Sequence, residues 1–73
     1  MAKVINLSGL SHKERVAAVS NIKTKTHVYA ITTSGHVIHG QLFMFAADDD
    51  FMVWSTCNND LIFTSEEIDS IIV

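Results

Sequence analysis

The stretch TTSGHVIHGQLFMF, residues 32–45, holds two of the three glycines of a chain that contains no proline. Gly35 and Gly40 stand five residues apart within what otherwise has the pattern of a β-hairpin. Glycine in such a place serves either the backbone, at a turn or a sharp bend, or a ligand that must approach the main chain closely. The residues on either side favour the first explanation.

From Thr26 onward, β-branched and aromatic residues alternate with a period of two, which is typical of strands. If residues 34–36 form a three-residue loop, Thr33 pairs with Val37. Gly35 then occupies the left-handed position of the turn. This register is the one that we expect.

In the same register Ala30 faces Gly40, and two small residues opposite each other let a sheet bend as strongly as a small barrel requires. A phosphate-binding loop is excluded, because both glycines lie within the hairpin and not before a helix. Both glycines are therefore predicted to be architectural. The residues expected in the core are Val28, Ala30, Ile38, Leu42, Val53 and Ile71.

Outside the hairpin, Ser11 and Glu14 form a capping box that predicts a helix over residues 11–21, with Asn21 as its stop. An Asn58-Asn59 turn would set Trp54 opposite Phe63. Ser65 is expected to cap the tight turn before the last strand. Five strands are predicted, at residues 26–33, 37–46, 51–57, 60–64 and 69–73.

The predicted fold class is mainly β: a short N-terminal helix followed by a strongly bent, five-stranded small barrel over residues 26–73. The 73 residues form one domain, which buries only about 60% of the surface of its unfolded chain. The single cysteine, Cys57, excludes an internal disulfide and a cysteine-rich zinc site. Self-association is therefore the favoured means of stabilisation.

The start of the chain lacks the pattern of a signal peptide, and no apolar run approaches the ~18 residues of a membrane helix. A cytoplasmic location without membrane contact is expected. His27 and His39 are expected ~13 Å apart along their strands, too far to share a metal. No base lies near Cys57, and Asp48–Asp50 lack the pattern of a calcium loop. The sequence therefore predicts no enzyme, no metal and no cofactor.

Charge divides the chain into two parts. All five cations lie in the first 25 residues beside one carboxylate, whereas residues 26–73 carry seven carboxylates and neither lysine nor arginine. The formal charges of the two parts are +4 and −7. Such asymmetry predicts a basic face, the alternative being a solvated surface without a ligand. The RNA-binding residues proposed on that face are Lys13, Arg15, Lys23 and Lys25.

A capped helix followed by five strands, with the hairpin quoted above, resembles the Sm/LSm family, including its bacterial Hfq-type members. The first family motif matches Gly35, Ile38, Gly40, Leu42 and Phe45, and the second matches Ile68 and Ile71. The resemblance covers nearly the whole chain. It implies the small barrel, a homo-oligomeric ring of about five to seven subunits, and binding of single-stranded RNA.

At the pore positions that bind uridine-rich RNA in that family, this chain differs. The corresponding residues are Ala46, Asp48, Asp50, Thr64 and Ser65, and Glu66 and Glu67 follow them. Carboxylates around a pore would repel phosphates, and no aromatic residue is present there for stacking. RNA is therefore expected on the basic helix face.

Two functions follow from these observations. The first is an RNA-binding, RNA-chaperone-type ring with an acidic pore. The second is a ring that serves as a protein-binding or scaffolding assembly without RNA. In both, the strand at 60–64 is expected to pair with the last strand of the next subunit, since nothing guards either edge. The interface residues would be Leu61, Ile62, Phe63, Ile71, Ile72 and Val73.

Overall fold

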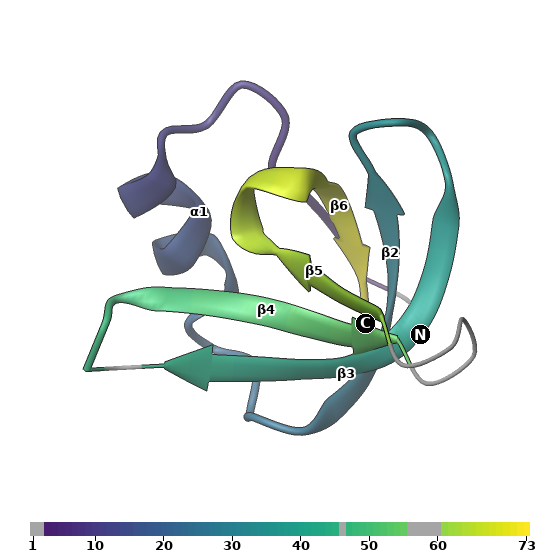
Figure 1. Ribbon diagram of the computed structural model, residues 1–73. Coiled ribbons are helices and arrows are strands. Elements are labelled where there is room, and N and C mark those ends of the chain that lie inside the picture. The colour runs from purple at the N-terminus through teal and green to yellow at the C-terminus, as the bar shows by residue number, and fades with distance from the viewer. Residues whose placement is uncertain (1–2, 46, 56–60) are drawn as a thin grey trace.

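The structure is a computed structural model that describes residues 3–45, 47–55 and 61–73. Its elements in chain order are β1 (Val4–Asn6), α1 (His12–Val19), β2 (Thr26–Thr32), β3 (Val37–Phe45), β4 (Asp50–Ser55), β5 (Leu61–Thr64), the 3-10 helix η1 (Ser65–Glu67) and β6 (Ile68–Ile72). The strands form one antiparallel sheet in the order β1-β6-β2-β3-β4-β5. Figure 1 shows the sheet curling round, with α1 beside it.

The capping box that begins α1 is confirmed. The Ser11 hydroxyl accepts a hydrogen bond from the Glu14 amide at 3.3 Å, and the Glu14 carboxylate accepts one from the Ser11 amide at 3.2 Å. The hydrogen bonds with Ser11 hold the pKa of Glu14 below its ordinary 4.5. Their contribution to the stability of the folded state is therefore present above pH 4.5 and is lost as the pH falls through the lowered pKa. The helix ends at Val19 with Ser20 as its C-cap, so the expected stop at Asn21 is wrong.

The first hairpin confirms the left-handed turn, since Gly35 has φ +86°. The expected register, however, is wrong by two residues: Ala30 pairs with Ile38, and Val28 pairs with Gly40. The loop begins one residue earlier than expected: the Thr32 amide donates to the His36 carbonyl at 2.8 Å and the Gly35 amide donates to the Thr32 carbonyl at 2.9 Å, so the turn spans residues 33–35. A slip of two residues leaves every side chain on its original face of the strand.

Gly40 is required by a close approach between strands and not by a pinch against Ala30. Strand β3 pairs with β2 through residues 37–42 and with β4 through residues 41–45, so the two halves of the sheet meet near Gly40. A Cβ at Gly40 would lie 2.0 Å from the carbonyl oxygen of Trp54. Only glycine fits where the backbone of β4 crosses this close.

The core lies inside the curled sheet, and α1 with the segment before it covers one opening. All six residues predicted for the core are buried, which confirms that prediction. The sheet also buries Phe51 and Ile68, and the N-terminal part of the chain adds Leu7, Val16 and Val19.

Within the described residues the sheet has six strands and not five. Strand β1 is not among the strands predicted from the sequence. It pairs with β6, with Val4 opposite Ile72, so β6 lies between β1 and β2 of the same chain. The sheet is open, with β1 and β5 as its edges, so closure into a five-stranded barrel is not confirmed.

The second half of the chain brings two more corrections. Trp54 pairs with Ile62 and not with Phe63, which lies opposite Val53. The expected turn at residues 58–59 lies outside the described residues, as does Cys57. Thr64, and not Ser65, is the N-cap of η1, where its amide donates to the Glu67 carboxylate at 3.1 Å.

Candidate functional site

A polar cluster joins the start of α1, the start of β4 and η1. His12 Nε2 lies 3.0 Å from the Asp49 carbonyl oxygen and 3.9 Å from Asp50 Oδ1. The Ser65 hydroxyl donates to Asp50 Oδ1 at 2.8 Å, and the Phe51 amide donates to the same oxygen at 2.8 Å. The structure thus brings together Asp50 and Ser65, two of the pore positions taken from the family resemblance.

Serine, histidine and aspartate in one cluster are the residue types of a hydrolase triad, but their geometry does not form one. Ser65 is 2% exposed and donates its proton to Asp50 instead of to His12. Its oxygen is 3.5 Å from His12 Nδ1, at the limit of a hydrogen bond. A nucleophile needs a base on its proton and room for a substrate. The cluster therefore connects α1 to the sheet.

Arg15 is also structural, although we expected it to bind RNA. Its guanidinium donates to three carbonyl oxygens, at 3.2 Å to Leu10, 2.9 Å to Ser65 and 2.5 Å to Ile68. These bonds close the η1 turn onto α1. Arg15 is half-buried and its Nε and Nη1 groups donate to backbone carbonyls, so it differs from the exposed lysines.

The expected lysines, Lys13, Lys23 and Lys25, are exposed. In the described part of the chain the only ion pair is the one between His12 and Asp50, so no described carboxylate forms an ion pair with these lysines. The structure adds a fourth exposed cation, Lys3 at the edge of β1, which we did not include. Lys3 and Lys23 line the same pocket.

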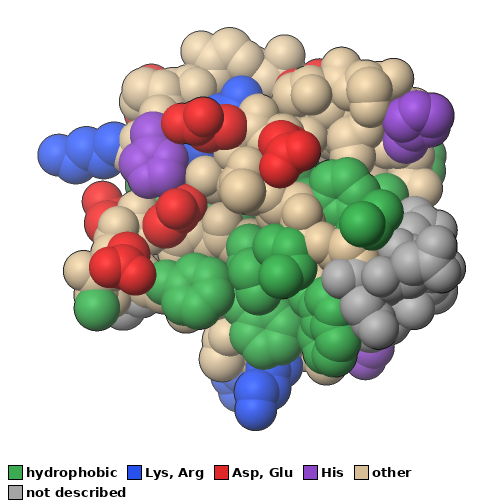
Figure 2. Space-filling model, viewed as in Figure 1, with side chains coloured by type: hydrophobic (Ala, Val, Ile, Leu, Met, Phe, Trp, Pro, Cys, Tyr) green, Lys and Arg blue, Asp and Glu red, His purple; other side chains and the backbone are tan. Residues whose placement is uncertain are grey.

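Carboxylates and apolar side chains occupy adjacent parts of one face, on which Lys or Arg side chains are also visible (Figure 2). Figure 2 shows acidic groups gathered around a histidine at the upper left, and apolar groups below them over β4 and β5. Of the pore positions, Asp48 and Thr64 are exposed and Asp50 is half-buried. Ala46 lies outside the described residues. The acidic character expected at these positions is therefore present on the surface.

The outward side of β3, β4 and β5 carries large apolar residues that strand pairing brings together from separate parts of the sequence. We call this set the outer apolar face. Phe43 and Trp54 are in tilted contact, with ring centroids 6.1 Å apart, and Ile62 and Phe45 are 56% and 41% exposed. Its members are Phe43, Phe45, Met52, Trp54 and Ile62.

His27 and His39 lie much closer than the ~13 Å that strand rise gave for the expected register. Their rings are stacked with centroids 5.6 Å apart, and the Tyr29 ring stacks on His39 at 4.6 Å. The corrected register causes this, because His27 pairs with Gln41 and His39 with Tyr29. Tyr29 is 52% exposed, so the stack presents an aromatic surface on β2 and β3.

The expected interface residues fall into two groups. On β5, Leu61 and Ile62 are exposed at an open sheet edge, and Phe63 packs against the core. The expectation that β6 presents an open edge is wrong. Ile71 is fully buried, and β6 already pairs with β1 and β2.

The missed edge, β1, left only a weak signal in the sequence. A strand of three residues, Val4–Asn6, spans too few positions for a period of two to be recognised. The adjacent β-branched pair Val4-Ile5 was the one available indication. Lys3 was therefore counted in the charge of the N-terminal part but could not be placed.

No family model, no curated protein and no solved structure matches this chain. Within the residues that the structure describes, no group of three histidine, cysteine or acidic residues could hold a metal ion. The described helices are too short and too polar to cross a membrane. We therefore infer function from the charges and surfaces of the chain itself.

Proposed function

We propose that this protein binds single-stranded RNA and works as a homo-oligomeric ring, the function that its resemblance to the Sm/LSm family implies. The small barrel of that family belongs to the proposal. It is supported by the position of α1 directly before the β2–β3 hairpin, and by β3, which pairs with β2 through one half and with β4 through the other.

The observation that carries the RNA-binding function is that the three lysines proposed for it are exposed and form no ion pair with a described carboxylate. Within the described residues, Lys13, Lys23 and Lys25 are exposed and form no ion pair, whereas His12 lies 3.9 Å from the Asp50 carboxylate. Cations without carboxylate partners are available to phosphates, which supply most of the affinity for a nucleic acid. RNA would therefore contact these three lysines and avoid the carboxylates of Asp48, Asp49 and Asp50.

Binding to a labelled single-stranded oligonucleotide should weaken as salt rises. Each lysine that contacts a phosphate contributes about −0.7 to the slope of log K against log salt. Changing Lys13, Lys23 and Lys25 together to glutamine should reduce the magnitude of that slope by about 2. Fluorescence anisotropy in a salt series measures the slope.

The matched control changes Asp48 and Asp49 together to asparagine, and it should bind at least as tightly as the unmodified chain. An unchanged slope in the triple glutamine variant, or binding lost in the asparagine variant, would place RNA on the acidic end and contradict the proposal. Arg15 stays unchanged in every variant because its guanidinium holds η1.

The ring contact needs a different partner strand from the one first expected. Because β1 occupies the edge of β6, the two open edges of the sheet in the described residues are β5 and β1. Pairing β5 of one copy with β1 of the next would satisfy both edges, and a head-to-tail contact of this kind can close into a ring. Exposed Leu61 and Ile62 on β5 and Val4 on β1 support this contact.

Light scattering should give a mass that is a multiple of 8.1 kDa for the unmodified chain. Ile62→Lys should reduce it to the monomer, since a lysine at the contact must lose its hydration. Val37→Lys is the control, because Val37 is 64% exposed on β3 and away from both edges. A monomer in the unmodified chain, or an assembly that survives Ile62→Lys, would refute this contact.

The second candidate function is a protein-binding or scaffolding ring without RNA. The outer apolar face favours it, because large exposed apolar patches mark interaction surfaces. Retention on immobilised RNA distinguishes the two functions. The RNA-binding protein should be released by salt, whereas a scaffold should not be retained at any salt concentration.

A further inference from the structure

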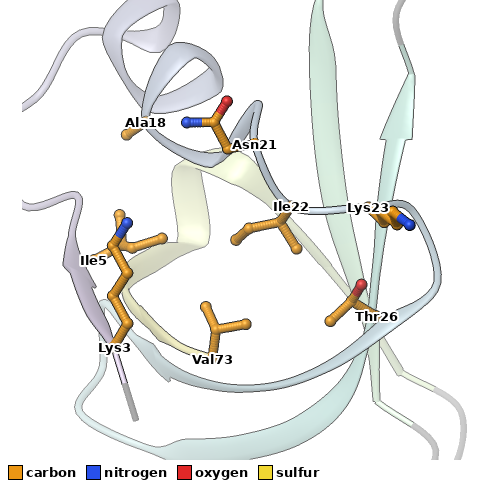
Figure 3. A pocket seen from close by; sticks show the side chains of 8 residues that line it. All are labelled: Lys3, Ile5, Ala18, Asn21, Ile22, Lys23, Thr26 and Val73. Carbon is orange, nitrogen blue, oxygen red and sulfur yellow. The ribbon is translucent and has the colours of Figure 1, made fainter. Parts of the chain in front are cut away.

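A pocket of about 300 Å³ lies between the end of α1, the loop that follows it, and the β1 and β6 end of the sheet. Figure 3 shows the side chains of Ile22 and Val73 extending into it and the two lysines on opposite sides. Its lining consists of Lys3, Ile5, Ala18, Asn21, Ile22, Lys23, Thr26 and Val73.

Backbone hydrogen bonds fix the walls of this pocket. The amide of Lys3 donates to the Val73 carbonyl at 2.8 Å, and the amide of Val73 donates to the Lys3 carbonyl at 2.9 Å. On the opposite side, the Ile22 amide donates to the Val19 carbonyl at 3.0 Å, and the Thr26 amide donates to the Lys23 carbonyl at 3.2 Å. The pocket is therefore preformed, and its residues lose little conformational entropy when a ligand binds.

The apolar part of the lining is continuous with the core. Ile5, Ala18 and Ile22 are half-buried and pack against the core cluster. An apolar body that enters the pocket would cover side chains that are partly in contact with water, which is favourable in proportion to the area removed. The volume is at the lower limit for small-molecule sites, so it suits a single ring system and not a large ligand.

The polar part of the lining selects for an anion. Lys3 and Lys23 supply two ammonium groups, Asn21 supplies an amide, and Thr26 supplies a hydroxyl. No aspartate or glutamate side chain belongs to the lining. An apolar ring with phosphate on either side is the chemistry of a nucleotide within a strand, and an asparagine amide can both donate to and accept from a base edge.

We propose that this pocket binds one nucleoside monophosphate unit of single-stranded RNA. The base lies against Ile5 and Ile22 with its edge toward Asn21, and the adjacent phosphates contact Lys3 and Lys23. This site rests on the proposed RNA-binding function and names the place where one nucleotide is held. It differs from the surface lysines Lys13 and Lys25, which contact phosphate without enclosing a base.

The chain offers a matched pair of variants for the test. Ala18 lines the pocket, whereas its neighbour Ala17 is exposed on α1 and does not. Ala18→Leu should fill the pocket without changing charge, and Ala17→Leu adds the same atoms to the helix surface. Leucine is nearly as good a helix former as alanine, so α1 should persist in both variants.

The isotope-labelled full chain is titrated with adenosine and uridine monophosphates, inorganic phosphate and decanoate, and each variant is titrated with a labelled oligonucleotide. Nucleotides should shift the amide signals of Ile5, Ala18 and residues 21–23. Ala18→Leu should weaken nucleotide and oligonucleotide binding about tenfold relative to Ala17→Leu. Changing Lys3 and Lys23 to glutamine should reduce the magnitude of the salt slope by about 1.4.

Each failure has its own signature. Equal binding by the two leucine variants, or equal shifts from phosphate or decanoate, would overturn the pocket even if RNA still binds elsewhere. Nucleotide shifts at the pocket without any binding of the oligonucleotide would overturn RNA as the source and identify a free nucleotide as the ligand. Salt-dependent oligonucleotide binding that Ala18→Leu weakens supports both proposals.

Discussion

Replacing Gly40 with alanine should lower the free energy of unfolding by about 4 kcal/mol or more and leave little folded protein. The added Cβ would lie 2.0 Å from the Trp54 carbonyl oxygen and 2.8 Å from the Ser55 Cα. Both neighbours are backbone atoms, so relief requires β3 and β4 to separate where β3 bends. A chain of this length has only about 4–11 kcal/mol of total stability.

Gly35→Ala provides the control in the same hairpin. Gly35 has a positive φ of +86°, but no atom lies within 4 Å of its added Cβ. The cost is therefore the backbone strain of a left-handed alanine, about 1–2 kcal/mol. Urea unfolding followed by circular dichroism measures both variants. If Gly40→Ala unfolds at the same urea concentration as Gly35→Ala, the close approach of β4 is not what requires glycine.

Arg15→Ala is expected to destabilise the protein by about 3 kcal/mol, since hydrogen bonds to charged groups are worth more than neutral ones. The guanidinium donates to the carbonyls of Leu10, Ser65 and Ile68, which lie on both sides of the joint between α1 and η1. Removing it leaves these oxygens without their donor. The loss should appear as faster amide exchange in η1 and α1, and as a lower midpoint in urea.

Two further variants separate shape from charge at this position. Arg15→Lys keeps the charge but cannot direct a planar fork at three carbonyls, so it should restore less than half of the lost stability. Lys13→Ala removes a cation from the exposed side of α1 and should change stability by less than about 0.5 kcal/mol. Equal effects of Arg15→Ala and Lys13→Ala would show that Arg15 acts only through its charge.

The polar cluster around Asp50 and the two lysines of the pocket have opposite consequences for the binding of a nucleic acid. His12, Asp50 and Ser65 bind one another and Asp49, and so hold an acidic end together. Lys3 and Lys23 face a pocket whose other side chains are neutral. We therefore expect variants of the acidic end to change stability, and variants of the pocket to change binding.

The sequence by itself determined which side chains face inward. A period of two assigns each residue to one face of its strand, and that assignment survives the two-residue error in register, since a slip of two preserves the face. Val28, Ala30, Ile38 and Leu42 are buried as expected for this reason. The capping box of α1 and the left-handed Gly35 were also predictable, because each depends on residues within one turn.

The tertiary structure alone decided the features that depend on distant parts of the chain. The role of Arg15 follows from carbonyls that are 50 and 53 residues away, and charge counting could not distinguish it from an exposed lysine. The need for Gly40 arises from the Trp54 backbone, and the pocket forms only when β1 brings Lys3 opposite the loop that holds Lys23. Periodicity and caps record local preferences, whereas register, edge pairing and pocket walls depend on contacts whose partners no short stretch of sequence specifies.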